Sequence, residues 1–455
     1  MLLRAFPHIA WLLLVVISAH LHVIVTGTAS ETTLAIVGVL LGLQTVYGFI
    51  VQGGRSINAS SVVLYGILLF AIFPALYAAR SFKLYQKTSD IESLVITLIL
   101  AGVLQTLLLT ICPPRRTRRI SLAHAGLSAS AGTTGILLLA ITMVLSFETL
   151  NPLQSATGML AILFAALATV TSQTRAGFLL ALLTLTASLL FYSLFVFDGF
   201  GRLVLGVIGF GILMLLTLRM PGYLLKIGVL VVSAPAILWL SYQRVAFLEE
   251  SRGMAVAESE GLGSVIGPFG SAAVIIEHMR DGILDPSHGT TVFAALVVFI
   301  PSALWAGKPV GFGTEMVPVT APELTHVVGY SDAGLLIGEG VWNFGILGSI
   351  GLFIMFCLGI RALDSVFAQT VTTMTTMRQP RLAMACRIVL IVALSSGLLN
   401  LFWGGLHTYS ARLFVIVPVV ALIWVFAKLL TEAQDLGQRT RSISLLPPER
   451  LRSPL

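Results

Sequence analysis

The chain has 455 residues, of which 57% are hydrophobic and 10% are charged, and its formal net charge is +7. Soluble domains carry charged residues at about a quarter of their positions, so this composition excludes an ordinary soluble protein and predicts a polytopic membrane protein. A positive net charge can indicate nucleic-acid binding. Here Lys and Arg lie mostly in short segments beside apolar runs, where they orient helices in a membrane. We therefore expect no nucleic-acid partner.

Apolar segments long enough to cross a membrane recur along the chain. The first has Arg4 before it and resembles a signal peptide, but the run from Phe6 to Val25 can cross a bilayer about 30 Å thick at about 1.5 Å per residue, so we expect a retained helix. In chain order the predicted spans, 12 ± 1 in number, are 5–27, 33–51, 59–79, 91–111, 125–147, 156–172, 176–196, 202–218, 223–241, 333–360, 383–403 and 411–430.

The predicted fold class is an all-α polytopic membrane protein of about 12 transmembrane helices, with one large extracytoplasmic loop containing short interfacial helices. Within that loop, 291–305 is apolar but short for a crossing and contains Pro301, which predicts a re-entrant or interfacial segment. The predicted regions are 1–241 with helices one to nine, 242–332 as the large periplasmic loop, 333–430 with helices ten to twelve, and 431–455 as a cytoplasmic tail.

Basic residues set the predicted orientation, because Lys and Arg are enriched in cytoplasmic loops. With a cytoplasmic N-terminus, most of the 27 basic residues fall on the cytoplasmic side, and an even number of spans returns the C-terminus there. The loop 242–332, which holds ten of the 20 acidic residues, then faces outward. Arg80, Lys83 and Lys87 are an exception, since they fall in a short outer loop.

The sequence lacks the patterns of a disulfide framework, of a metal site and of several soluble-enzyme active sites. Cys112, Cys357 and Cys386 lie in or beside apolar runs and have neither metal-ligand spacing nor an even disulfide framework, so we expect them to be packing residues. No phosphate-binding Gly-Lys-Ser/Thr loop, His-Glu-x-x-His or Gly-x-Ser-x-Gly motif occurs. The sequence therefore supports neither ATP hydrolysis nor zinc proteolysis, and we expect no metal and no cofactor.

Glu339 is a candidate functional residue, because an ionisable side chain within a spanning segment is costly and often functional. Asn343, four residues later, lies on the same helical face. The pair predicts a polar wall of a substrate cavity at the outer leaflet. The alternative is a structural hydrogen bond that ties two helices together.

The large loop supplies cations and groups that titrate near neutral pH. A guanidinium matches phosphate oxygens in a bidentate fork, so the loop cations could hold a diphosphate, while a salt bridge to one of the many loop acids is the alternative. For each loop histidine the alternative is a solvated side chain. These residues are Arg252, Arg280, Lys308, His278, His288 and His326.

The order of residues around the end of the loop resembles a known family. Pro301, Trp305 and Lys308-Pro309 precede a Gly-rich stretch, and Gly338-Glu339 and Asn343-Phe344-Gly345 open the next span. This order is similar to that of the bacterial oligosaccharide repeat-unit polymerases, the Wzy-type O-antigen and exopolysaccharide polymerases. The match covers mainly 250–360. Thr174-Arg175-Ala176-Gly177 also resembles a Ser-Arg-Gly turn of many members, with Thr in place of Ser.

The resemblance implies a metal-independent glycosyltransferase of the bacterial inner membrane, with polyprenyl-diphosphate-linked oligosaccharide as donor and acceptor, building O-antigen, capsule or exopolysaccharide at the periplasmic face. A general base would activate the acceptor hydroxyl and cations would stabilise the departing diphosphate. It further implies a chain-length-regulating membrane protein and a flippase as partners. The catalytic candidates are Arg252, Arg280, His326 and Glu277; the substrate-binding candidates are Glu339, Asn343, Lys308, Trp305 and Arg175.

Two other functions fit the same pattern. An O-antigen ligase has a similar number of spans and a similar outer loop, but moves the finished glycan to a lipid A core. A lipid-linked oligosaccharide flippase or other secondary transporter also suits about 12 spans. Transport sites lie near the membrane midplane among broken helices, however, whereas the polar residues here gather in one loop.

Overall fold

The computed structural model describes residues 2–80, 90–113, 125–146, 151–196, 204–220, 222–233, 235–236, 239, 258–301, 303–326, 330–376 and 382–444. Within these ranges every regular element is helical and no strand occurs. The predicted all-α class is confirmed for this part of the chain.

The elements of the described residues are α-helices, three π-helices and one 3₁₀-helix. In chain order they are α1 (Leu2–Thr26), α2 (Glu31–Val51), α3 (Ala59–Ile67), the π-helix η1 (Leu68–Ile72), α4 (Phe73–Arg80), α5 (Ile91–Ile111), α6 (Ala125–Leu145), α7 (Asn151–Thr171), α8 (Arg175–Phe191), the π-helices η3 (Tyr192–Val196) and η4 (Val204–Phe210), α10 (Gly211–Leu216), α12 (Glu258–Arg280), α13 (Thr290–Leu296), α14 (Phe312–Glu315), α15 (Val317–Thr320), the 3₁₀-helix η5 (Pro322–Leu324), α16 (Leu335–Thr376) and α17 (Leu382–Ser444).

Short polar residues set where several of the apolar helices begin. Asp90 caps α5 by accepting hydrogen bonds from the backbone N–H groups of Glu92 and Ser93. Ser30 and Thr33 form a reciprocal capping box at the start of α2. Such caps satisfy N–H groups that the first turn of a helix leaves without partners. These caps lie at the starts of helices that are otherwise apolar on all sides, which is a pattern found in helices that contact lipid.

Nine helices of the described residues are long and apolar enough to cross a bilayer, so the chain is a multi-pass membrane protein. Seven of them have 20 to 22 residues and coincide with the first seven predicted spans. The other two, Leu335–Thr373 and Leu382–Leu429, have 39 and 48 residues. At about 1.5 Å per residue each exceeds the roughly 30 Å of one crossing. The predicted span 223–241 contains a shorter apolar helix, Gly222–Ser233.

Both long helices fold back on themselves at a glycine. Gly345 in α16 (φ 71°, ψ 175°) and Gly405 in α17 (φ 83°, ψ −179°) have backbone angles that only glycine adopts readily. The hydroxyl of Tyr409 donates to the carbonyl of Leu394, 15 residues earlier, at 2.9 Å. In a straight helix those residues would be roughly 22 Å apart. α17 therefore has two antiparallel limbs, 382–404 and 406–444, which correspond to the last two predicted spans.

The fold-back of α16 corrects the prediction that 333–360 forms one continuous span. A Cβ atom placed on Gly340 would lie 3.0 Å from the Cβ atom of Ser349, so the chain reverses between them. The first limb, 335–344, is only about 15 Å long and is too short to cross the membrane. The sequence pattern missed this break because apolar residues continue through Gly345. The second limb, 346–376, is the part long enough to span.

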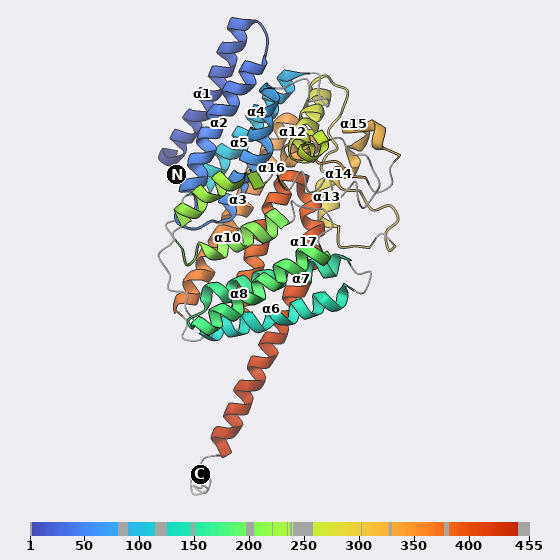
Figure 1. Cartoon of the computed structure of the whole chain (residues 1–455). Coiled ribbons are helices and arrows are strands. Elements are labelled where there is room, and N and C mark those ends of the chain that lie inside the picture. The colour runs from blue at the N-terminus through green and yellow to red at the C-terminus, as the bar shows by residue number, and fades with distance from the viewer. Residues whose placement is uncertain are drawn as a thin grey trace, which may run out of the picture.

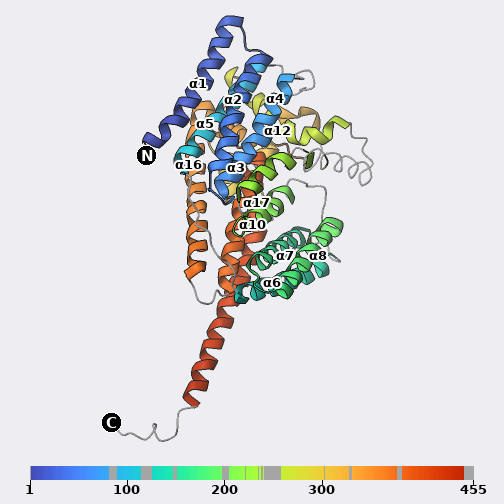
Figure 2. The same cartoon turned by 60° about the vertical axis from the view of Figure 1, so that its left-hand side comes forward.

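The predicted loop packs largely onto the helix bundle. α12 is 23 residues long, and its Phe269, Ala273 and Ile276 are buried in the core that α5 and α16 share. Only α13 occupies the apolar stretch predicted at 291–305, and it ends at Leu296. Both views show α12 to α15 in the half of the molecule that contains α4, while the end of α17 projects from the other half (Figures 1 and 2).

Two buried charges hold the connection between α2 and α3. The Asp364 carboxylate of α16 accepts hydrogen bonds from Asn58 Nδ2 at 2.9 Å, from the backbone N–H of Ala59 at 2.8 Å and from Ser60 Oγ at 2.7 Å. The buried ammonium of Lys226 donates to backbone carbonyls of 50–54. Each charge meets polar groups at one helix end, which offsets the cost of burial.

Candidate functional site

Glu339 lies at the meeting point of three elements. Its side chain, on the short limb of α16, has no exposed surface. Oε1 accepts a hydrogen bond from Thr291 Oγ1 of α13 at 3.2 Å. Oε2 accepts one from the backbone N–H of Leu406 at 2.6 Å, at the first residue of the second limb of α17. One buried carboxylate therefore joins the loop helix α13 to both folded-back helices.

The fold-back at Gly405 creates the acceptor site for this carboxylate. The reversal leaves the N–H of Leu406 without a partner within its own helix, and a carboxylate at a helix N-terminus is stabilised by the helix dipole. A Cβ atom on Gly405 would lie 2.5 Å from Glu339 Oε2. Glycine is therefore required both by the positive φ and by the close approach of Glu339.

Asn343 ties α13 to the same limb of α16. Its Nδ2 donates to Thr291 Oγ1 and to the backbone carbonyl of Glu339, each at 2.7 Å. Its Oδ1 accepts from Ser287 Oγ at 3.1 Å and from the backbone N–H of Thr291 at 3.2 Å. This amide uses its full hydrogen-bonding capacity within the protein. Glu339 differs, because the two oxygens of a carboxyl group offer more acceptor positions than the two hydrogen bonds that they accept from the described residues.

Aromatic rings and a second carboxylate border this cluster. Phe312 of α14 packs edge-on against Trp342, with 6.3 Å between ring centroids. Burial raises the pKa of Glu315, and the nearby indole N–H of Trp342 offsets part of that rise. The two groups are not at hydrogen-bond geometry, and Glu315 Oε2 and Trp342 Nε1 have no hydrogen-bond partner among the described residues. The indole N–H therefore acts on the carboxylate only through its proximity, since a hydrogen bond requires both distance and angle.

His407 is a half-buried imidazole next to the Glu339 contact, and the sequence analysis did not single it out. A Cβ atom on Gly311 would collide with its ring, so the loop backbone passes directly over it. Lys308 is close enough to act on it electrostatically. The signal in the sequence was a histidine in Gly404-Gly405-Leu406-His407, between two predicted spans.

Lys308 and Trp305 stabilise the loop itself. The ammonium of Lys308 donates to the backbone carbonyls of Val298 and Ile300, each at 2.8 Å. The Trp305 ring packs edge-on against Phe293 of α13, with centroids 6.3 Å apart. Both predicted substrate-binding residues therefore lie beside α13, the helix that contacts Glu339. Their observed contacts are with the protein, and their predicted binding role stays a prediction.

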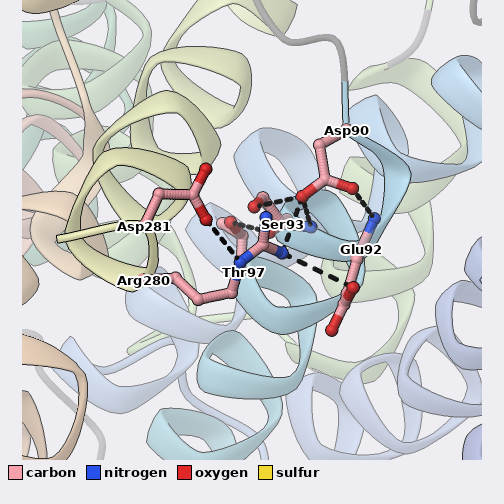
Figure 3. Close-up of polar contacts among 6 residues, drawn as sticks. All are labelled: Asp90, Glu92, Ser93, Thr97, Arg280 and Asp281. Carbon is pink, nitrogen blue, oxygen red and sulfur yellow. Dashed lines mark hydrogen bonds and ion pairs between the residues drawn. The ribbon is translucent and has the colours of Figure 1, made fainter. Parts of the chain in front are cut away.

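Arg280, a predicted diphosphate ligand, lies in an ion-pair network (Figure 3). Its guanidinium is 2.7 Å from Asp90, 3.5 Å from Glu92 and 3.0 Å from Asp281. The network links the end of α12 to the start of α5. A salt bridge, the alternative considered for this arginine, is present, but only Asp281 is a loop acid, while Asp90 and Glu92 lie at the start of α5. Any phosphate would compete with three carboxylates.

The other predicted site residues lie apart from these contacts. Glu277 is half-buried one turn before the end of α12, His326 is exposed after η5, and Arg175 is exposed at the first residue of α8. Arg252 lies outside the described residues. No hydrogen bond or ion pair given for the described residues joins Glu277, His326 or Arg175 to Glu339. In the same part of the chain, no group of three or more His, Cys, Asp and Glu side chains could hold a metal ion.

Comparisons with known proteins give no match: no family model, no curated protein and no solved structure resembles the chain. The chemistry of the site is therefore inferred from its own residues.

Proposed function

We propose that this protein is a metal-independent membrane glycosyltransferase. It would polymerise polyprenyl-diphosphate-linked oligosaccharide repeat units into O-antigen, capsule or exopolysaccharide at the periplasmic face of the bacterial inner membrane. The supporting observation is the group formed by Glu339, Asn343, Thr291 and the backbone N–H of Leu406, which we call the Glu339 cluster. A loop helix and two folded-back membrane helices meet at one buried carboxylate that keeps acceptor capacity for a ligand hydroxyl.

The proposed topology has about 12 crossings, both termini in the cytoplasm and the segment 242–332 outside. The two limbs of α17 support it, because an antiparallel pair of crossings brings the chain back to the side on which α17 begins. The cluster then lies toward the periplasmic side, where a flipped lipid-linked sugar is available.

Four residues have proposed roles in this reaction. Glu339 orients a sugar hydroxyl through its remaining acceptor positions. His407 joins His326 as a candidate general base, because its imidazole lies one residue from the Glu339 contact. Arg280 would stabilise the departing diphosphate only after release from Asp90.

The test of this function is the variant Glu339→Gln. Gln keeps one carbonyl acceptor and nearly the same volume, so the fold should persist while the ionised acceptor is lost. In cells that depend on this protein for polymer, gels of the extracted glycan should show single repeats and loss of long chains. The control is Glu323→Gln, at an exposed carboxylate of η5, which should leave chain length unchanged. Long polymer from Glu339→Gln at normal protein level would contradict the site.

A transporter is the second candidate, because α16 and α17 are discontinuous helices of the kind that transporters use at their binding sites. Purified protein supplied with lipid-linked repeats, and with no ion gradient, separates the candidates. A polymerase lengthens the glycan on the polyprenyl lipid, and a ligase lengthens nothing but moves glycan to a lipid A core. A transporter gives neither product.

A further inference from the structure

α13 has two chemically different faces. Thr291, Ala294 and Ala295 are buried against α16 and α17, at the i, i+3, i+4 spacing of one helical side. Phe293 and Leu296 lie on the other side and are 49% and 67% exposed. A helix of seven residues thus places hydrogen bonds to Glu339 on one side and large apolar side chains on the other.

The chain after α13 extends this exposed side. Phe299 is 55% exposed and Leu304 is 80% exposed. The loop that carries them is closed by the contact between Trp305 and Phe293 and by the two hydrogen bonds that Lys308 donates to its carbonyls. We refer to Phe293, Leu296, Phe299 and Leu304 as the apolar loop face. The closure of the loop holds these side chains outward.

The apolar loop face is continuous with the lipid-facing surface of α16. Gly289, at the start of α13, lies against the ring of Phe344, since a Cβ atom there would be 3.5 Å from Phe344 Cε1. Phe344 is 40% exposed, and Leu347, just after the fold-back, is 82% exposed. Met355 and Leu358 continue the exposed apolar stripe along the spanning limb. Exposed apolar side chains on a spanning helix meet acyl chains.

Charge also favours lipid over water or a soluble partner. From 289 to 307 the sequence has no charged residue. Lys308, the first charge that follows, uses its ammonium inside the loop. Short helices with one apolar face at a membrane surface typically bury that face among headgroups and acyl chains, whereas water-facing loops rarely expose a continuous apolar patch.

We propose that the apolar loop face is inserted into the bilayer at the loop end of the molecule, so that α13 stands between acyl chains and Glu339. Its partner is the membrane lipid itself. One consequence rests on the proposed function: a lipid-borne substrate reaches Glu339 from the side by displacing α13, which Thr291 holds to Glu339 and to Asn343.

The test measures lipid contact and needs no enzymatic activity, so its failure is distinct from failure of the proposed function. Leu296→Cys and Leu304→Cys are labelled with bimane in the full-length protein, with the buried native cysteines left in place. The protein is reconstituted in phosphatidylcholine and phosphatidylglycerol vesicles with or without lipids that carry a doxyl quencher. We expect both positions to lose fluorescence to the extent seen at Leu347→Cys, on the lipid-facing limb.

Glu323→Cys, on the exposed η5, is the water-facing control and should be unquenched. Quenching at 296 and 304 that matches position 323 would overturn the proposal. Fluorescence that is unchanged by doxyl lipid but varies with the ratio of protein to lipid would also overturn the proposal. That result would show that the apolar loop face contacts a second copy of this chain. Leu304 is 80% exposed, so its variant tests the proposal even where Leu296→Cys folds poorly.

Discussion

Single residues at the Glu339 cluster illustrate how polar chemistry is accommodated inside an apolar bundle. A buried carboxylate is costly unless hydrogen bonds compensate for lost water. Glu339 receives one from a hydroxyl of α13 and one from a backbone N–H released by the reversal of α17. The sequence identified this residue because a lone acid within an apolar span is conspicuous. Its partners, Thr291 and Leu406, had no comparable signal.

Gly405→Ala should destabilise the protein by about 1–3 kcal/mol, because an Ala side chain would be strained at φ +83° and would collide with Glu339 Oε2. The matched control is Gly351→Ala in the spanning limb of α16, where an added Cβ atom meets nothing within 4 Å. Thermal unfolding in detergent measures both. Equal melting temperatures for the two variants would refute the strained reversal at Gly405.

Individual elements show which predictions depended on local pattern. The first seven spans could be predicted because each apolar run of about 20 residues ends at a polar cap or turn. α12 could not, because its apolar face is diluted by Gly and Ser and it lies among loop acids. Its final residue, Arg280, attaches it to α5 through Asp90. This ion pair, from residues far apart in the chain, left no signal in the sequence.

The link between α12 and α5 should depend on pH. Burial acts to raise the pKa of Asp90, but hydrogen bonds from Ser93, from the Glu92 backbone and from Arg280 outweigh it, so the pKa is lowered. A lowered folded pKa adds stability above the unfolded value of about 4, and this stability is lost as pH falls through the folded pKa.

The free energy of unfolding should therefore rise less between acidic and neutral pH in Arg280→Ala than in the unmodified protein. The difference should be under about 1 kcal/mol, because the guanidinium is partly exposed. Unfolding midpoints across that pH range, at low and high salt, measure the effect. Arg175→Ala, at an exposed arginine of α8, is the control. A pH dependence unchanged by Arg280→Ala would show that the hydrogen bonds from Ser93 and from the Glu92 backbone alone lower the Asp90 pKa.

At the scale of the whole molecule, the fold-back of α17 adds one crossing to the nine long helices, whereas the short limb of α16 adds none. The ends of the bundle then differ in character. One half contains α12 to α15, of which α13 donates a hydrogen bond to Glu339, and the limb of α17 projects from the other half (Figures 1 and 2). Because Lys and Arg are enriched in cytoplasmic loops, the sequence predicts that the segment 242–332 faces the periplasm. This orientation can be tested directly.

Thr314→Cys, on the exposed side of α14, should react with an impermeant thiol reagent in intact spheroplasts. Thr372→Cys, near the end of α16, should react only after the membrane is permeabilised. Mass-shift gels report both. The reverse pattern would place the Glu339 cluster at the cytoplasmic end and would remove the basis for action on periplasmic lipid-linked sugars.

The sequence by itself determined the class of protein and most of the spans, and it singled out Glu339 and Asn343 as candidates, because hydropathy and the cost of a buried charge act within one local stretch. Only the tertiary structure decided that α16 and α17 reverse at Gly345 and Gly405, that α13 and His407 lie beside Glu339, and that Arg280 is paired with Asp90. Those features depend on contacts between residues distant in the chain, which apolar periodicity does not encode.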